Sequence, residues 1–65
     1  MGTQQEFLKI FREARVKAEK QAKLSRLNGS IMCLDNIDEN GFHYYFHDDG
    51  IREGELSVYW SELGY

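Results

Sequence analysis

The spacing of apolar residues changes from a helical to a strand period near Asn28 and Gly29, and this change divides the 65-residue chain into two elements. Upstream, apolar side chains recur every three or four positions and form one stripe, as in an amphipathic helix. The stripe consists of Phe7, Ile10, Phe11, Ala14, Ala18 and Ala22. Glycine adopts the left-handed conformation at helix ends without strain, so Gly29 is the expected stop. The pattern predicts a helix over residues 3–28.

The expected start of this helix is Thr3. The sequence Thr3-Gln4-Gln5-Glu6 is that of a capping box, in which the Thr3 hydroxyl accepts the amide hydrogen of Glu6. The Glu6 carboxylate in turn accepts the amide hydrogen of Thr3. The two reciprocal bonds satisfy backbone groups that a helix start otherwise leaves without partners.

Residues 30–61 predict a three-stranded antiparallel meander. Two turn sequences, Asp38-Glu39-Asn40-Gly41 and Asp48-Asp49-Gly50, separate three stretches of strand character. The predicted strands cover residues 30–35, 42–47 and 51–61, with Gly54 as a candidate β-bulge in the third. A helix over residues 55–63 is the alternative for the last stretch, and the alternation of apolar and polar residues there favours the strand.

The predicted fold class is therefore α+β, with a long N-terminal helix packed on one face of a three-stranded antiparallel meander in a single small domain over residues 1–65. The side chains expected to face the helix are Phe42, Tyr44, Phe46, Leu56, Val58 and Trp60, together with Ile31 and Cys33. Those expected to face outward are His43, Tyr45, His47 and Tyr59, together with Met32 and Leu34.

A homodimer is expected from the small size of the chain. Domains this short bury little of their surface and usually gain stability from disulfides, a metal or self-association. Cys33 is the single cysteine, which excludes an intramolecular disulfide. The predicted helix is about 36 Å long, whereas strands of five or six residues span about 17–20 Å. A second copy is the simplest cover for the overhanging apolar positions.

The two halves carry opposite charge. Residues 1–27 contain seven basic and three acidic side chains, a net charge of +4, and residues 28–65 contain one basic and eight acidic, a net charge of −7. The basic side chains that would contact nucleic acid are Lys9, Arg12, Arg15, Lys20, Lys23 and Arg26. Glu13 and Glu19 interrupt this basic face, and the sequence pI of about 5.2 is low for a nucleic-acid-binding protein. Nucleic-acid binding is therefore an alternative rather than the preferred function.

No pattern in the sequence favours catalysis, a metal or a cofactor. His43 and His47 lie about 13 Å apart along a strand, too far to share a zinc ion. Residues 36–47 place glycine correctly for a calcium loop, but His47 stands where the loop needs a bidentate glutamate. Cys33 has no partners that would activate a thiol, and Asp48 and Asp49 are ordinary turn formers. We expect a protein that is not an enzyme.

The outward sheet face predicts a site for another protein. Aromatic side chains inside an acidic rim have the composition of a protein–protein interface. The predicted partner-binding residues are His43, Tyr45, His47, Tyr59, Asp48, Asp49, Glu53 and Glu55. The expected function is a small non-catalytic protein-binding module that engages a basic surface. It would be an acidic inhibitor or decoy of the kind phages encode, which blocks a nucleic-acid-handling or defence protein. A purely structural, homo-oligomeric assembly subunit is a further alternative.

The expected cellular location follows from the absence of a signal-peptide pattern and of a long apolar segment in the sequence. The N-terminus has no basic region followed by an apolar segment, which a signal peptide needs. The longest run without a charged residue, Leu27–Leu34, is far shorter than the roughly 20 residues that span a bilayer. The expected location is cytoplasmic, in the host cell if a phage encodes the chain, with no membrane partner.

Overall fold

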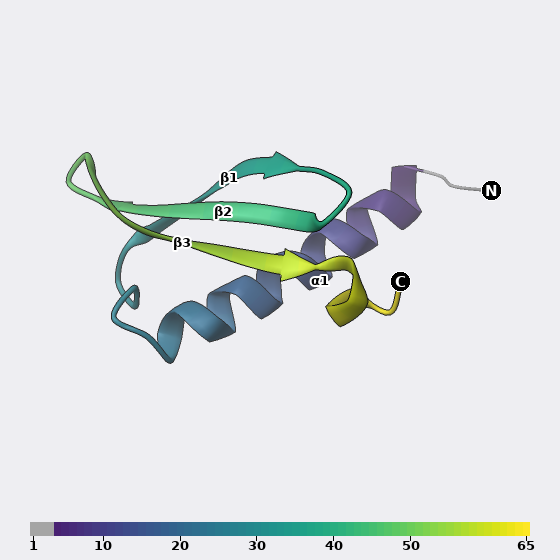
Figure 1. The fold of residues 1–65 in the computed structure, drawn as a ribbon, viewed down its shortest axis with the longest axis horizontal. Coiled ribbons are helices and arrows are strands. Elements are labelled where there is room, and N and C mark those ends of the chain that lie inside the picture. Colours follow the sequence, from purple (N-terminus) through teal and green to yellow (C-terminus); the bar gives the residue numbers. More distant parts are fainter. Residues whose placement is uncertain (1–3) are drawn as a thin grey trace.

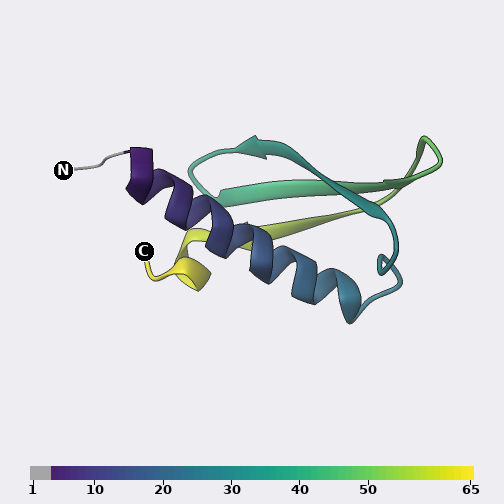
Figure 2. The same cartoon turned by 180° about the vertical axis from the view of Figure 1, so that it is seen from behind.

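The computed structural model describes residues 4–65 and contains one α-helix followed by a three-stranded antiparallel sheet. The elements are α1 (Gln4–Lys23), β1 (Ile31–Ile37), β2 (Gly41–Asp48), β3 (Ile51–Tyr59) and the short 3-10 helix η1 (Trp60–Leu63). The strand order is β1-β2-β3, and α1 runs diagonally across one face of the sheet (Figures 1 and 2). This arrangement confirms the predicted α+β class. The predicted capping box depends on Thr3, which lies outside the described residues.

The regular helix ends at Lys23, so the predicted end at residue 28 is wrong. Ser25 is responsible locally, because its hydroxyl donates to the Ala22 carbonyl at 3.0 Å and accepts the Leu27 amide hydrogen at 3.2 Å. A serine that bonds to nearby backbone competes with the helical pattern. A series of turns then leads to Gly29, whose φ of +98° is the expected left-handed conformation before β1.

The last strand ends at Tyr59, two residues before the predicted end, and residues 60–63 form a helical turn instead. The alternative prediction of a helix over residues 55–63 is therefore wrong for residues 55–59, which belong to β3. Only residues 60–63 are helical. Trp60 fixes the turn to the loop between β1 and β2, because its amide donates to the Asn40 carbonyl at 3.1 Å and its indole to the Asp38 carbonyl at 2.9 Å.

Each edge strand contains an irregularity. In β3, Phe46 faces Gly54 while His47 faces Arg52, which leaves Glu53 without an opposite residue. The predicted bulge near Gly54 is therefore confirmed. The glycine also provides room, since a Cβ at this position would lie 3.1 Å from the Leu27 side chain. A second shift in β1 occurs between Leu34 and Asn36.

The core lies between the small face of α1 and the aromatic face of β2. The buried side chains are Ala14, Ala18, Ala22, Phe42, Tyr44, Phe46 and Val58. The small alanine side chains let the helix backbone approach the aromatic rings. Phe42 contacts the edges of two further rings, Phe11 at a centroid distance of 6.0 Å and Trp60 at 5.1 Å. These ring contacts attach the helix and the C-terminal turn to the central strand.

The predicted orientation of β1 is wrong. Met32 packs against the buried core, whereas Cys33 lies opposite Tyr45 in the ladder and shares its face. Ile31, predicted to face inward, is 57% exposed. Residues 31–34 are all apolar and show no alternation, so the sequence did not indicate which of them face inward.

The length mismatch expected between helix and sheet is also wrong. The 20 residues of α1 extend about 30 Å. The nine residues of β3 extend nearly as far at about 3.3 Å each. The helix therefore does not overhang the sheet by several turns, and a second copy has to be argued from other features.

Tyr44→Phe is expected to stabilise the domain by about 1 kcal/mol. Tyr44 is only 3% exposed, and its hydroxyl has no hydrogen-bond partner among the described residues. Burial also raises the pKa of this phenol, which therefore stays neutral at physiological pH. Urea denaturation of both proteins tests the prediction, and a lower unfolding free energy for the variant would show that the hydroxyl has a partner in solution.

Candidate protein-binding surface

The face of the sheet opposite α1 is open, and its residues form three cross-strand rows. The ladder aligns Ile31, His47 and Arg52 in one row, and Cys33, Tyr45 and Glu55 in the next. The third row consists of Asn36, His43 and Ser57. We call the side of the sheet that carries these rows the open face. It contains five of the predicted partner-binding residues: His43, Tyr45, His47 and Glu55 within the rows, and Tyr59, which lies opposite Gly41 beyond the third row.

Tyr45 is at the centre of the open face, and its neighbours hold its ring in place. The Arg52 guanidinium lies 4.9 Å from the ring centroid, and the His47 ring lies 6.0 Å away. Arg52 also forms an ion pair with Glu55, so its charge is partly neutralised within the face. A hydrogen bond with the Cys33 side chain raises the pKa of Tyr45, so its phenol remains neutral at physiological pH. The result is a preorganised aromatic surface of the kind that interfaces use.

His43, one of the predicted partner-binding residues, is held by two hydrogen bonds within the sheet. Its Nδ1 lies 2.7 Å from the Ser57 hydroxyl, and its Nε2 lies 2.7 Å from Asp38 Oδ1. The same Asp38 oxygen accepts the amide hydrogens of Asn40 at 2.8 Å and Gly41 at 3.2 Å. The bond from His43 is the main cause that lowers the pKa of Asp38. We call Asp38, His43 and Ser57 the turn brace.

The turn brace contains the residue types of a serine-hydrolase triad, and sequence reasoning missed it. Such a triad also needs a substrate cleft and free donors to stabilise an oxyanion. The four hollows of about 400, 290, 220 and 130 Å³ beside α1 are not lined by Asp38, His43 or Ser57. The Asp38 carboxylate is already used by two backbone amides of its own turn. These contacts favour a structural function, which ties the β1–β2 turn to β3.

The hairpin between β2 and β3 carries the acidic part of the site. Asp48, Asp49 and Glu53 are exposed at this end of the sheet, which projects beyond the helix (Figure 1). Ile51 lies among them and is 65% exposed. We call residues 48–53 the acidic tip. Tyr59, the remaining predicted residue, is 52% exposed at the opposite end of β3, so it belongs to the same strand but not to the tip.

The basic residues of the alternative nucleic-acid site are exposed, and most of them lie on α1. Lys9, Arg12, Lys20 and Lys23 lie on α1. Arg15 instead forms an ion pair with Glu19 at 3.0 Å, and Arg26 lies in the turns after the helix. The helix therefore offers fewer phosphate contacts than the charge count suggests.

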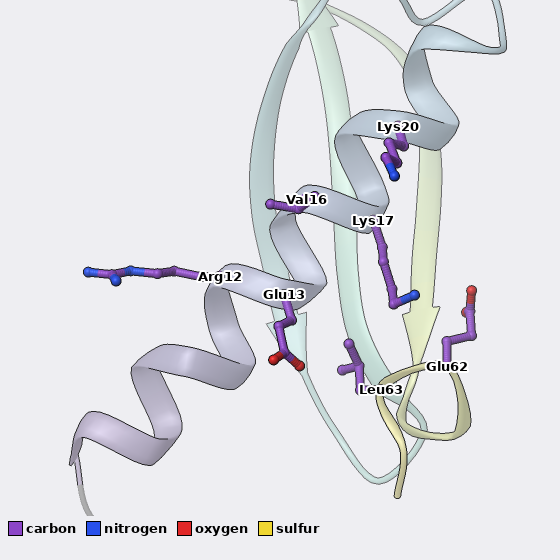
Figure 3. A pocket seen from close by; sticks show the side chains of 7 residues that line it. All are labelled: Arg12, Glu13, Val16, Lys17, Lys20, Glu62 and Leu63. Atoms are coloured by element: carbon purple, nitrogen blue, oxygen red, sulfur yellow. The ribbon is translucent and has the colours of Figure 1, made fainter.

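A hollow of about 400 Å³ separates the basic helix from η1 (Figure 3). Arg12, Lys17 and Lys20 line it together with Glu13, Glu62, Val16 and Leu63. In Figure 3, Lys17 extends toward η1 whereas Arg12 points away. The two carboxylates would repel a phosphate, so this hollow does not make the helix a better nucleic-acid site.

The ion pairs of the described residues lie within the two halves of the chain rather than between them. Among the described residues, the ion pairs Arg15–Glu19 and Arg52–Glu55 and the His43–Asp38 hydrogen bond each join residues of the same half. The hydrogen bond between Gln21 and Glu62, 3.4 Å long, crosses between the halves without pairing charges. The carboxylates of the acidic tip and the basic side chains of α1 are both exposed.

Two further observations concern metal and membrane. Within residues 4–65, no three His, Cys, Asp or Glu side chains are grouped as a metal site would require. Over the same residues, the structure contains no helix of the length and apolar character that a bilayer crossing demands.

Comparisons with protein-family models, curated proteins and solved structures found no match to this chain.

Proposed function

We propose that this chain is a small non-catalytic protein-binding module that docks through its open face and acidic tip. The observation that carries the proposal is the arrangement around Tyr45. An aromatic ring is fixed by Arg52 and His47 in the middle of a face that the helix leaves uncovered. Rigid aromatic anchors of this kind supply much of the binding energy in protein interfaces. Exposed carboxylates at one end of the same sheet would select a basic partner.

The partner class follows from the charge of the tip. Asp48, Asp49 and Glu53 lie close together in the chain and are all exposed. A cluster of exposed carboxylates is complementary to a surface that binds phosphates. We therefore propose an inhibitor or decoy, of the type that phages encode, that covers the nucleic-acid-binding surface of a host or defence protein. Such a protein would act in the cytoplasm of the host cell.

Affinity capture from a nuclease-treated cell lysate tests the proposal. We expect the tagged chain to retain a protein that binds nucleic acid. Excess duplex DNA should release that protein, because DNA and the acidic tip would compete for one surface. Retention of nucleic acid itself at about 50 mM salt, lost as salt rises, would instead support binding by the basic helix. Capture of no such protein would contradict the proposed function.

A further inference from the structure

Strand β1 has an outer edge that is unpaired among the described residues. The strand order leaves β1 with β2 on one side only, and the backbone hydrogen bonds outside the helices and strands do not involve residues 31–37. An edge strand presents amide and carbonyl groups to which a further strand can pair, and charged side chains discourage such pairing. β1 contains one charged residue, Asp35, whereas β3 at the other edge contains three. β1 is therefore the edge that favours the addition of a strand.

A groove lies beside this edge, on the side of the sheet that α1 covers. In Figure 2, α1 runs diagonally and β1 lies to one side of it. A hollow of about 220 Å³ is lined by Phe11, Arg15, Met32, Leu34 and Tyr44. A second hollow, of about 130 Å³, shares Met32 and adds Glu19 and Lys23. We call the two hollows together the β1 groove. Because side chains alternate between the faces of a sheet, a strand added to β1 would direct every second side chain into this groove.

Part of the groove wall is apolar. Phe11 and Met32 pack against the buried core, and Leu34 is 38% exposed in the same hollow. Apolar side chains gathered along one groove are typical of a binding site rather than of scattered surface residues. Apolar side chains on an added strand would remove this wall from water.

The flank of α1 beside the groove is basic. Five residues follow one another at steps of three or four and share this flank: Leu8, Arg12, Arg15, Glu19 and Lys23. Three cations and one carboxylate give the flank a net charge of +2. The Arg15 guanidinium already lies 3.0 Å from the Glu19 carboxylate, so Arg12 and Lys23 supply the excess positive charge. Arg12 extends to the side of α1 away from η1 (Figure 3). Charge complementarity therefore favours an acidic occupant.

Tyr44 gives an independent indication that the groove receives a hydrogen-bond acceptor. This residue lines the larger hollow and is 3% exposed, and its hydroxyl has no partner among residues 4–65. Burial is the main cause that raises the pKa of the phenol, and the charges of Arg15 and Glu19 also act on it, so the phenol lies close to the basic flank. A buried donor without a partner is rare in folded proteins and costs stability.

We propose that the β1 edge and the β1 groove bind an extended segment of a partner protein as a fourth strand, with apolar and acidic side chains facing the groove. The backbone of the segment pairs with residues 31–34, which precede the irregularity in β1. Its apolar side chains cover Met32 and Leu34, and a carboxylate accepts the Tyr44 hydroxyl hydrogen beside Arg15. Strand addition derives affinity from main-chain hydrogen bonds and specificity from alternate side chains.

A second copy of the chain fits this site poorly. If two copies paired β1 with β1 across a two-fold axis, both helices would lie on one side of the joined sheet. Their basic flanks would then face each other, and like charges oppose that approach. An acidic segment of another protein meets no such opposition. The site leaves the open face and the acidic tip uncovered and prefers the opposite charge, so it does not depend on the proposed function.

A pair of defined peptides tests the proposal by NMR titration of the isotope-labelled chain. The first peptide, acetyl-Thr-Val-Thr-Glu-Thr-Val-Thr-amide, carries its apolar and acidic side chains on one face, and the second has lysine in place of glutamate. We expect the glutamate peptide to shift the amide signals of residues 31–34, with a dissociation constant below about 1 mM. The lysine peptide should bind about tenfold more weakly.

N-methylation of the glutamate peptide distinguishes strand addition from simple adhesion to the groove. In a paired strand, the amides of every second residue face the neighbouring strand. Methylation of one alternate set of amides should therefore abolish binding, whereas methylation of the other set should leave it unchanged. Equal effects of the two sets would overturn the proposal, because the peptide backbone would then not pair with β1.

Tyr44→Phe separates binding from stability. We expect this variant to bind the glutamate peptide about tenfold more weakly, because the hydroxyl that donates to the carboxylate is gone. The same substitution is expected to stabilise the domain, so the weaker binding cannot come from loss of the fold. Lys23→Glu should remove most of the preference for the glutamate peptide over the lysine peptide. Lys17→Glu, in the hollow beside η1, is the matched control and should keep that preference.

Three results of these titrations would overturn the proposal. The first is no shift of the residue 31–34 signals at about 1 mM glutamate peptide. The second is equal binding of the glutamate and lysine peptides. The third is a wild-type dimer whose residue 31–34 amides are already protected from hydrogen exchange without peptide, because a second copy would then occupy the edge.

Discussion

Gly41→Ala is expected to unfold the domain or to reduce its free energy of unfolding by about 3 kcal/mol or more. Gly41 is buried at the start of β2 and has a φ of +149°, which side chains other than glycine rarely adopt. An added Cβ would collide with the Val58 carbonyl oxygen and lie 2.8 Å from the Tyr59 Cα. Both atoms belong to the backbone of β3, so the clash can be relieved only by separating β2 from β3.

Gly50→Ala is the matched control for this prediction. Gly50 also has a positive φ, of +78°, but a Cβ there would meet no atom within 4 Å. We expect it to cost only the backbone strain, about 1–2 kcal/mol. Urea denaturation followed by Trp60 fluorescence measures both variants. Equal losses at the two positions would show that backbone conformation, and not the approach to β3, makes Gly41 necessary.

Asp38→Ala is expected to lower the melting temperature by about 10 °C, because the turn brace loses its central acceptor. One carboxylate oxygen of Asp38 serves the amides of Asn40 and Gly41 and the ring of His43. Removal of the side chain leaves all three groups without this partner. The Asp38 backbone carbonyl also accepts the Trp60 indole hydrogen, so a relaxed turn would loosen η1.

Asp38→Asn separates the hydrogen bonds of Asp38 from its charge. The amide oxygen can still accept the two backbone hydrogens, so we expect a smaller loss than for alanine. The wild-type pKa of Asp38 is lowered in the folded state, first by the His43 bond. Its contribution to stability is therefore complete above the unfolded value of about 3.8 and is lost as pH falls through the folded pKa. Melting temperatures at pH 7 and pH 3 should show a smaller acid effect in Asp38→Asn than in wild type, and identical acid effects would contradict this assignment.

Much of the fold could be predicted because local patterns agree with it. The alanine stripe predicts a helix that approaches the sheet closely, and Ala14, Ala18 and Ala22 are buried. The turn sequences place both hairpins. The end of the helix could not be predicted. It depends on two hydrogen bonds of the Ser25 hydroxyl, and the sequence around this serine looks like that of an ordinary helix. The facing of β1 could not be predicted either, since four apolar residues in succession fit both phases.

The contacts among Asp38, His43 and Ser57 could not be predicted from the sequence, because they depend on the register between β2 and β3. The pairing of Asp48 with Ile51, continued without interruption, would place His43 opposite Leu56. The bulge at Glu53 shifts the register by one residue and places His43 opposite Ser57. The sequence indicates this register shift indirectly. Phe42 and Val58 can both face the core only if one residue of β3 has no partner in β2. Asp38 was assigned to the turn, but its contact with His43 depends on the folded geometry of both strands.

The two charged regions have different surroundings in the fold, and this difference decides between them. Acidic side chains on the tip accompany a fixed aromatic face, whereas the basic side chains on the helix are separated by Glu13 and partly paired by Glu19. An interface needs both apolar area and complementary charge. The sheet side supplies both, and the proposal of partner binding there rests on this combination.

The central claim is that the open face and acidic tip carry partner binding, and equilibrium titration of the captured partner tests it most directly. We expect Tyr45→Ala to raise the dissociation constant about 30-fold, as for an anchor residue. Asp48→Lys/Glu53→Lys should also weaken binding, and more strongly at low salt. The controls Leu24→Ala and Lys20→Glu/Lys23→Glu should bind like wild type, since they alter the helix end and the basic helix. Loss of binding in these controls, with Tyr45→Ala unaffected, would contradict the account.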